Sequence, residues 1–158
     1  MNMRIGFGYD IHELREGLPF QLGGVTVPHT KGALGHSDAD VLIHAVCDAL
    51  LGACSLRDIG FHFPDTDSQY KGINSSELLR KTIQLVSNQG YNVGNIDCTV
   101  VLEKPKIGPF IDAMRKAMST IMGIPEKDIS IKATTNEKLG PVGREEGVCA
   151  YAVALIHS

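Results

Sequence analysis

The first segment of the chain alternates between large apolar positions and small or polar ones. Within residues 3–12, Gly6, Gly8, Asp10 and His12 occupy every second position, and large apolar side chains precede each of them from residue 5 onward. Side chains of a β-strand alternate between its two faces, so this pattern predicts a strand with one apolar face and one nearly bare face. The bare glycine face would let another backbone or a ligand approach closely, and Asp10 and His12 stand at its end.

Periodicity and cap signals predict the helices and turns that follow. A hairpin is expected to turn at Gly23-Gly24, and the Gly/Pro/Asp-rich segment 54–72 is expected to be a long loop. Each predicted helix begins at Ser, Asn or Pro and ends before a glycine; the helices are expected at Ser37–Leu51, at 74–89 behind a capping box, and at Pro109–Met122.

Runs rich in β-branched and apolar residues predict the remaining strands. They are expected at Val93–Glu103, Ile129–Thr135 and Val148–Ile156. The last run lacks alternation, which predicts burial on both faces. Strands separated by helices, with βαβ crossovers, predict an α/β or α+β sandwich with a mixed β-sheet and helices packed on one face.

Length, charge and cysteine content narrow the class of protein. The 158 residues fit a single domain spanning 1–158. A net charge of −3 argues against a nucleic-acid surface, and no run approaches the roughly 18 apolar residues of a membrane span. The first strand begins too near the N-terminus for a signal peptide, and the four cysteines show no C-x-x-C spacing. We therefore expect a cytoplasmic protein with reduced thiols.

Asp10 and His12 are two of the three protein ligands that a catalytic zinc site keeps. The candidate third ligand is His44, which forms a polar stripe with Asp40 and Asp48 on the predicted helix. Taken alone, that stripe fits a solvated face or a surface ion pair of little energetic value. The sharper hypothesis is that the helix packs over the glycine face and His44 completes the site. Asp40 or Asp48 would then accept a hydrogen bond from the outer imidazole nitrogen.

Three other polar segments could bind phosphate or hydroxyl groups. His36-Ser37-Asp38 precedes the predicted helix, where an anion is favoured, although N-capping by Ser37 or Asp38 also explains these residues. Carboxylates in the segment Asp58–Asp67 either form ordinary turns or accept hydrogen bonds from a polyol. Thr134, Thr135 and Glu137 follow a strand and suit a phosphate with a divalent ion, although two threonines in a strand are also ordinary.

Together and in this order, these segments resemble the 2-C-methyl-D-erythritol 2,4-cyclodiphosphate synthases, the cyclases of the non-mevalonate isoprenoid pathway. The similar motifs extend over nearly the whole chain. They are Arg4-Ile5-Gly6 through Asp10-x-His12, Gly23-Gly24-Val25 with Pro28, His36-Ser37-Asp38-x-Asp40 with His44, Asp58-Ile59-Gly60 with Phe63-Pro64-Asp65-Thr66-Asp67, Lys104-Pro105-Lys106, Lys132-Ala133-Thr134-Thr135-x-Glu137-Lys138-Leu139-Gly140, and Gly143-Arg144-x-Glu146-Gly147.

The resemblance implies a homotrimer whose sheets face the threefold axis, with active sites between neighbouring subunits. It implies Zn²⁺ on Asp10, His12 and His44, and Mg²⁺ or Mn²⁺ on Glu137 and the substrate diphosphate. Thr135, Glu137 and Asp58 are the expected catalytic residues. The residues implied to bind the methylerythritol phosphate and cytidine diphosphate parts of the substrate are His36, Ser37, Asp58, Ile59, Gly60, Phe63, Pro64, Asp65, Thr66, Asp67, Leu102, Glu103, Lys104, Pro105, Lys106, Ile107, Gly108, Ala133, Thr134, Thr135, Asn136, Glu137 and Arg144.

The implied reaction is cyclisation of 4-diphosphocytidyl-2-C-methyl-D-erythritol 2-phosphate with release of CMP. An axial cavity for an isoprenoid diphosphate is also implied, with Arg144 as phosphate partner. Pro141 stands where the family often has an aromatic residue lining that cavity, and Asn136 replaces a third threonine. A zinc phosphohydrolase that activates water, and a non-enzymatic trimeric sensor of nucleotides or isoprenoid diphosphates, are the competing interpretations.

Overall fold

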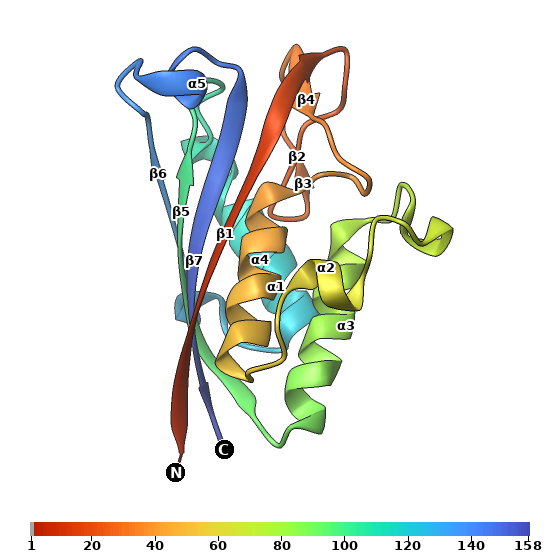
Figure 1. The fold of residues 1–158 in the computed structure, drawn as a ribbon. Coiled ribbons are helices and arrows are strands. Elements are labelled where there is room, and N and C mark those ends of the chain that lie inside the picture. Colours follow the sequence, from red (N-terminus) through yellow and green to blue (C-terminus); the bar gives the residue numbers. More distant parts are fainter. Residues whose placement is uncertain (1) are drawn as a thin grey trace.

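A computed structural model describes residues 2–158. Within these residues, a five-stranded sheet has the order β4-β1-β7-β5-β6 (Figure 1). Its strands are β1 (Met3–Glu16), β4 (Lys31–Ala33), β5 (Asn92–Val101), β6 (Ile129–Thr134) and β7 (Gly147–His157). Only β5 and β6 pair in parallel, and the other neighbours are antiparallel. The predicted mixed sheet is confirmed.

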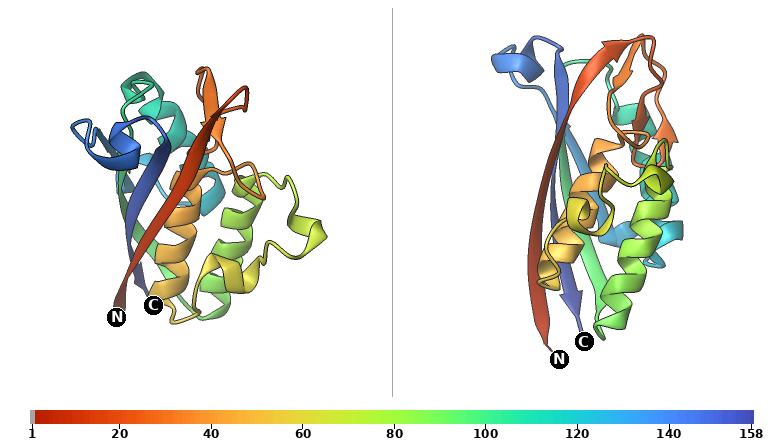
Figure 2. Two further views of the ribbon diagram at one scale, coloured as in Figure 1. Left: turned by 45° about the horizontal axis from the view of Figure 1, so that its top comes forward. Right: turned by 45° about the vertical axis from the view of Figure 1, so that its right-hand side comes forward.

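Helices cover one face of this sheet, as predicted (Figures 1 and 2). The long helices are α1 (Val41–Ala53), α3 (Ser75–Asn88) and α4 (Ile111–Met122). Short elements complete the chain: β2 (Gln21–Leu22), β3 (Val25–Thr26), α2 (Ile59–His62), α5 (Gly140–Gly143), and the 3₁₀ turns η1 (Ser68–Tyr70), η2 (Gly108–Phe110) and η3 (Glu126–Asp128). The β2–β3 hairpin turns at Gly23-Gly24, as predicted. No helix in the described part of the chain has the length and apolar character needed to cross a membrane.

The glycine face of β1 is covered by α1. A Cβ added to Gly6 would lie 1.8 Å from the carbonyl oxygen of Ala49, and one added to Gly8 would lie 1.9 Å from that of Ala45. Two elements in such close contact leave no room for any side chain at these strand positions. The hypothesis that a helix packs over the bare face is therefore confirmed, and it brings α1 beside Asp10.

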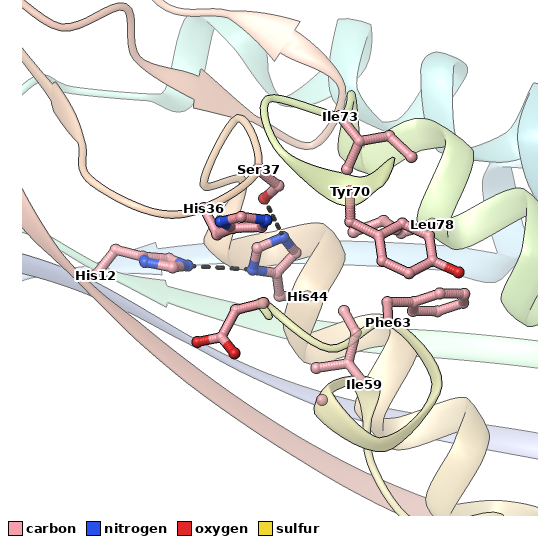
Figure 3. Close-up of a pocket in the computed structure, with 11 residues that line it drawn as sticks. His12, His36, Ser37, His44, Ile59, Phe63, Tyr70, Ile73 and Leu78 are labelled. Atoms are coloured by element: carbon pink, nitrogen blue, oxygen red, sulfur yellow. Dashed lines mark hydrogen bonds between the residues drawn. The ribbon is translucent and has the colours of Figure 1, made fainter. Parts of the chain in front are cut away.

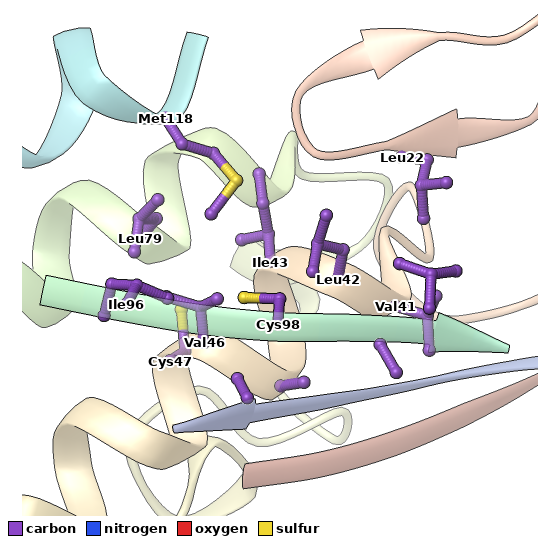
Figure 4. Packing of buried hydrophobic residues seen from close by; sticks show 14 of the residues in the cluster. Leu22, Val41, Leu42, Ile43, Val46, Cys47, Leu79, Ile96, Cys98 and Met118 are labelled. Atoms are coloured by element: carbon purple, nitrogen blue, oxygen red, sulfur yellow. The ribbon is translucent and has the colours of Figure 1, made fainter. Parts of the chain in front are cut away.

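The core lies between the sheet and the three long helices. Figure 4 shows Val46 of α1 beside Ile96 of β5, with Val41 near Leu22 of β2 and Met118 of α4 on the helix side of the same cluster. These side chains are almost completely buried. Burial of this kind is the main favourable term in folding, so the core holds β1 and α1 in place without help from a ligand.

Most element boundaries differ from the predictions by one or two residues, and α1 continues through Gly52 to Ala53 instead of stopping at Leu51. Two differences are larger. Helix α1 begins at Val41 instead of Ser37, because Asp40 is the N-cap and accepts a hydrogen bond from the backbone N of Ile43 at 3.0 Å. Ala39 has a φ of 57°, which lies outside the right-handed helical region. The segment 54–72 is also more ordered than a plain loop, since it contains α2 and η1.

The prediction that β7 is buried on both faces is wrong for the isolated chain. Ala150, Ala152 and Ala154 face the helices and are buried, whereas Tyr151 and Val153 on the other face are 40% and 42% exposed. Apolar side chains on both faces of β7 produced the unbroken run in the sequence. The exposed outer face continues across β1, and its large side chains are Met3, Ile5, Phe7, Tyr9, Ile11, Tyr151 and Val153.

Candidate metal centre and active site

The three predicted metal ligands lie together at the junction of β1 and α1. Oδ2 of Asp10 is 2.9 Å from Nε2 of His12 and 3.0 Å from Nδ1 of His44. The two imidazole nitrogens are 3.1 Å apart. In a tetrahedral zinc site with bonds of 2.0–2.1 Å, ligand atoms stand about 3.3 Å apart. The triangle therefore needs to open only slightly to hold such an ion.

Hydrogen bonds on the outer side of each imidazole determine which nitrogen faces the centre. Nδ1 of His12 lies 2.9 Å from the carbonyl oxygen of Leu34, which can only accept. His12 therefore keeps a hydrogen on Nδ1, and its Nε2 faces the centre, where it donates a proton to Asp10 or, once that proton leaves, offers a lone pair to a metal ion. Nε2 of His44 lies near the hydroxyls of Ser37 and Ser75, at 3.1 and 2.9 Å. Histidine metal ligands in proteins almost always have such outer partners.

The charge state of Asp10 also suits a cation. Burial alone would raise the pKa of Asp10, but hydrogen bonds with His12 and His44 lower it to about 2. Burial opposes charge on His12, and the contact with Asp10 prevails and raises the pKa of His12 above its usual value. An ionised carboxylate oxygen beside two inward-facing imidazole nitrogens is a donor set that fits a divalent transition metal.

The expected roles of Asp40 and Asp48 are wrong. Asp40 is 0% exposed, which excludes a solvated stripe. Its carboxylate accepts from the backbone N of Gly23 at 2.9 Å and of Gly24 at 2.7 Å, so it joins the β2–β3 turn to the start of α1. Asp48 accepts from the backbone N of Ile59 at 2.7 Å and so ties α2 to α1. Serines, rather than these carboxylates, meet the outer nitrogen of His44.

A pocket of about 340 Å³ opens beside the metal centre (Figure 3). Six residues predicted to bind substrate line it: His36, Ser37, Ile59, Gly60, Phe63 and Asp65. Figure 3 shows His12 and Ser37 each approaching a different nitrogen of the His44 ring, with Phe63 and Tyr70 forming the far wall. Tyr70, Ile73 and Leu78 also line this pocket, and no motif in the sequence had indicated them. Their apolar character is ordinary for core residues, so no sequence signal distinguished them.

Other residues of the acidic segment form local structure in the chain as described. Asp58 caps α2 by accepting from the backbone N of Phe61 at 2.9 Å. Asp67 caps η1 by accepting from the backbone N of Gln69 at 3.0 Å. His36, Ser37 and Asp38 lie in the segment before α1, which begins only at Val41, so they do not form the first turn of that helix.

A second pocket, of about 280 Å³, joins two predicted substrate segments that are distant in sequence. Its lining comes from the end of β5 and the turn after it, and from β6: Leu102, Pro105, Lys106, Ile107, Gly108, Pro109, Ala133, Thr134 and Thr135. Beside it, Oε1 of Glu103 accepts from the backbone N of Asn136 at 2.9 Å and of Lys138 at 3.3 Å. Glu103 therefore braces the loop after β6. Lys104 pairs with Glu145 at 3.1 Å.

The loop after β6 presents Thr135 and Glu137 to solvent beside the second pocket. Oγ1 of Thr135 donates to Oε1 of Glu137 at 3.2 Å. Glu137 and Lys138 have φ values of 50° and 63°, an uncommon left-handed conformation that costs about 1–3 kcal/mol per residue. Arg144 is exposed and pairs with Glu146 at 2.9 Å.

Sheet register separates the two pockets within one chain. Asp10 pairs with Ala150, Ala150 with Val100, and Val100 with Ala133. Three strand spacings place Asp10 about 14 Å from Ala133. Ala150 and Val100 are both 0% exposed, so packed side chains cover the sheet between the pockets.

Comparisons with known proteins point in one direction. The sequence profile of the YgbB family matches residues 3–157. The 2-C-methyl-D-erythritol 2,4-cyclodiphosphate synthase of Cytophaga hutchinsonii is 58% identical over 156 residues, which cover 99% of this chain and 98% of that protein. Similar solved structures include the bifunctional IspDF from Campylobacter jejuni, with a TM-score of 0.94 and 41% identity. The chain described here covers 42% of that larger protein, and 98% of this chain is matched.

A second solved structure is matched over its whole length. It is a 2C-methyl-D-erythritol-2,4-cyclodiphosphate synthase in a form bound to CDP. Its TM-score is 0.90 and its identity 40%, with 98% of this chain and 100% of that chain covered. Similarity at this level extends through every element that supplies the two pockets.

Proposed function

The chain belongs to the YgbB family, and from that premise we propose that it is a phosphorus–oxygen lyase of the cyclodiphosphate synthase type. It converts 4-diphosphocytidyl-2-C-methyl-D-erythritol 2-phosphate to 2-C-methyl-D-erythritol 2,4-cyclodiphosphate and CMP. The observation that carries the proposal is the Asp10, His12 and His44 triangle beside a pocket lined by polar and apolar groups. A relative that is 58% identical over nearly its whole length is named 2-C-methyl-D-erythritol 2,4-cyclodiphosphate synthase.

The reaction needs positioning more than acid–base chemistry. An oxygen of the 2-phosphate forms a bond to the β-phosphorus, and the bond from that phosphorus to the α-phosphate bridging oxygen breaks. CMP leaves with the electron pair, so no proton has to move. Because the attacking phosphate is already anionic, the chain's task is to fold a flexible substrate and to neutralise charge.

The residues of the first pocket suit the methylerythritol phosphate part. His36 and Ser37 offer donors to a phosphate, and Asp65 can accept from a hydroxyl. Ile59 and Phe63 give the pocket an apolar wall that limits water near the reacting phosphates. Bound zinc on Asp10, His12 and His44 would polarise the β-phosphate, and Mg²⁺ or Mn²⁺ on Glu137 would assist departure of CMP.

The cytidine diphosphate part is assigned to the second pocket. Lys106 adds positive charge there, and the hydroxyls of Thr134 and Thr135 can donate to phosphate oxygens. A 40% identical protein has a solved structure bound to CDP, which supports a binding site for cytidine diphosphate in this chain. Thr135, Glu137 and Asp58 remain the proposed catalytic residues, with Asp58 acting near the first pocket.

One active site takes its two pockets from neighbouring subunits of a homotrimer. The two pockets of one chain lie about 14 Å apart with the packed side chains of Ala150 and Val100 between them, which favours an active site completed by a neighbouring subunit. The outer sheet face exposes large apolar side chains, among them Ile5 at 71% and Phe7 at 63%. Contiguous apolar patches of this kind mark interaction surfaces. A closed ring of three would bury these faces on its axis and set the β6 edge of one subunit beside the β1 edge of the next.

The proposal also covers the domain organisation of the chain, its cellular location and a ligand of the axial cavity. We infer one domain over the whole chain and a cytoplasmic location, where four free buried cysteines stay reduced. An isoprenoid diphosphate in the axial cavity, held by Arg144, remains a prediction. Pro141 contributes to a neighbouring pocket, and it offers less apolar surface than an aromatic side chain would.

A product assay by mass spectrometry tests the function. Enzyme with zinc and magnesium is expected to yield equal amounts of CMP and cyclic diphosphate, without inorganic phosphate. Release of inorganic phosphate would instead indicate the phosphohydrolase. Absence of turnover with both metals present would favour a binding protein.

A further inference from the structure

A buried serine that no motif indicated meets the outer nitrogen of His44. Nε2 of His44 lies 2.9 Å from Oγ of Ser75 and 3.1 Å from Oγ of Ser37. Ser75 is the first residue of α3 and is 0% exposed, whereas Ser37 is half-buried on the rim of the pocket. Ser75 thus reaches the metal centre from a helix that supplies none of the three ligands.

Asp38 fixes the direction of the Ser75 hydroxyl. Oγ of Ser75 donates to Oδ1 of Asp38, and the backbone N of Ser75 donates to Oδ2 at 3.0 Å. An ionised carboxylate can only accept hydrogen bonds, so the serine hydrogen points toward Asp38. The Ser75 oxygen then turns a lone pair to His44, and His44 must supply an N–H to it.

These bonds determine the tautomer of His44. With its hydrogen on Nε2, the ring has its lone pair on Nδ1, the atom that lies 3.0 Å from Asp10 and 3.1 Å from His12. Ser37 imposes no such choice, because its own hydroxyl hydrogen can rotate while its oxygen accepts from the backbone N of Ala39 at 3.2 Å.

We propose that Asp38 and Ser75 form a positioning pair that holds His44 as the Nε2–H tautomer and thereby raises the metal affinity of the centre. The pair also links the centre to the pocket wall. The backbone N of Asp38 donates to the carbonyl oxygen of Ile73 at 3.0 Å, and Ile73 lines the pocket. This role rests on the proposed function, which assigns a metal to the three ligands.

Zinc alone, without substrate, is the probe that tests the pair. Metal-free wild type and Ser75→Ala are titrated with zinc against a chromophoric chelator. Loss of an outer partner of a metal-bound histidine weakens affinity about 10–100-fold, and we expect a loss of that size. Ser76→Ala is the matched control, since Ser76 lies in the same helical turn with its hydroxyl near Gly24, and its affinity is expected to equal wild type.

Cobalt substitution supplies a readout that a purely structural role would not move. The visible absorption of bound cobalt reports ligand geometry, and Ser75→Ala is expected to shift it while Ser76→Ala does not. If Ser75→Ala does not fold, Asp38→Asn decides the question. The amide replaces an accepting oxygen with a donor that opposes the hydrogens of Ser75, so the same loss of affinity is expected.

Two results separate the failure of this inference from the failure of the proposed function. Zinc affinity of Ser75→Ala within twofold of wild type, with an unchanged cobalt spectrum, overturns the positioning pair. Wild type that binds zinc but forms no cyclic product contradicts the proposed function and leaves the affinity comparison valid.

Discussion

The two pockets of this chain hold their polar groups in different ways. At the metal centre, the imidazoles of His12 and His44 are each fixed by outer hydrogen bonds on packed elements. Beside the second pocket, Thr135 and Glu137 belong to a solvent-exposed loop and contact each other at 3.2 Å. The first arrangement is complete within one chain. The polar side chains of the second become fixed only when a ligand binds to them.

This difference has a thermodynamic meaning. Side chains fixed by packing lose their rotamer freedom when the protein folds, so binding does not have to order them again. Side chains on an exposed loop lose it when the ligand binds. Changes at the metal centre should therefore affect metal content and all turnover. Changes at the loop should affect turnover while the metal stays bound.

The largest expected effect lies beneath the metal centre. Gly8→Ala would place a Cβ 1.9 Å from the carbonyl oxygen of Ala45, so α1 must move away from β1. We expect a loss of stability of about 3 kcal/mol or more, measured by urea denaturation. Gly52→Ala is the matched control in α1, because its Cβ would lie 3.9 Å from the nearest atom, and it should be neutral or stabilising. Equal stability of the two variants would contradict the close packing.

Removal of one ligand should abolish the metal centre without unfolding the chain. His44→Ala is expected to lose stoichiometric zinc and turnover, because two remaining ligands do not make a zinc site. Circular dichroism should stay as in wild type, since the core beneath α1 is unchanged. Retention of zinc by this variant, measured by metal analysis, would exclude His44 as a ligand.

The loop should respond differently. Glu137→Gln keeps the size of the side chain and removes its charge. We expect kcat to fall about 10–100-fold and the magnesium requirement to rise, with zinc content unchanged, because only part of the several kcal/mol of metal stabilisation is lost. Loss of zinc in this variant, or normal turnover at low magnesium, would refute the division of labour between the two metals.

The smallest effect is expected at the brace of this loop. Glu103→Ala removes the acceptor of the backbone N–H groups of Asn136 and Lys138. Loss of about 1 kcal/mol of hydrogen bonding predicts a roughly fivefold rise in KM with unchanged zinc affinity. Glu103→Gln retains an accepting oxygen and should restore most of the wild-type KM. A fall in zinc affinity in Glu103→Ala would show that the two regions are not independent.

Local patterns predicted the parts of the site that lie on regular elements. The alternation along β1 indicated the glycine face, and the Asp-x-His spacing put Asp10 and His12 on that face. The i, i+4 spacing from Asp40 to His44 predicts a helix, and the chain is helical from Val41 onward. The pattern does not define the first residue of this helix, because Ser37, Asp38 and Asp40 are all good cap residues. The left-handed Ala39 that excludes the first two is not visible in a sequence.

Contacts between distant segments could not be predicted in the same way. Ser75 is 31 residues from His44, and its position as a capped helix start explains it without any metal. In β7, apolar residues on both faces looked like burial within the chain, whereas Tyr151 and Val153 are exposed. Sequence alone does not separate a face that meets a helix from a face that meets another subunit. The single domain, the substrate contacts and the trimer remain predictions.

Subunit mixing tests most directly whether the two pockets of one active site come from different chains. His44→Ala and Glu137→Gln proteins are unfolded together, refolded as a mixture and assayed for CMP. If neighbouring subunits share a site, random reassembly restores both halves in about a quarter of the sites, so activity rises well above the sum of the two variants. If both halves of each site come from one chain, the mixture shows only the summed activity of the separate variants, and that result would contradict the account.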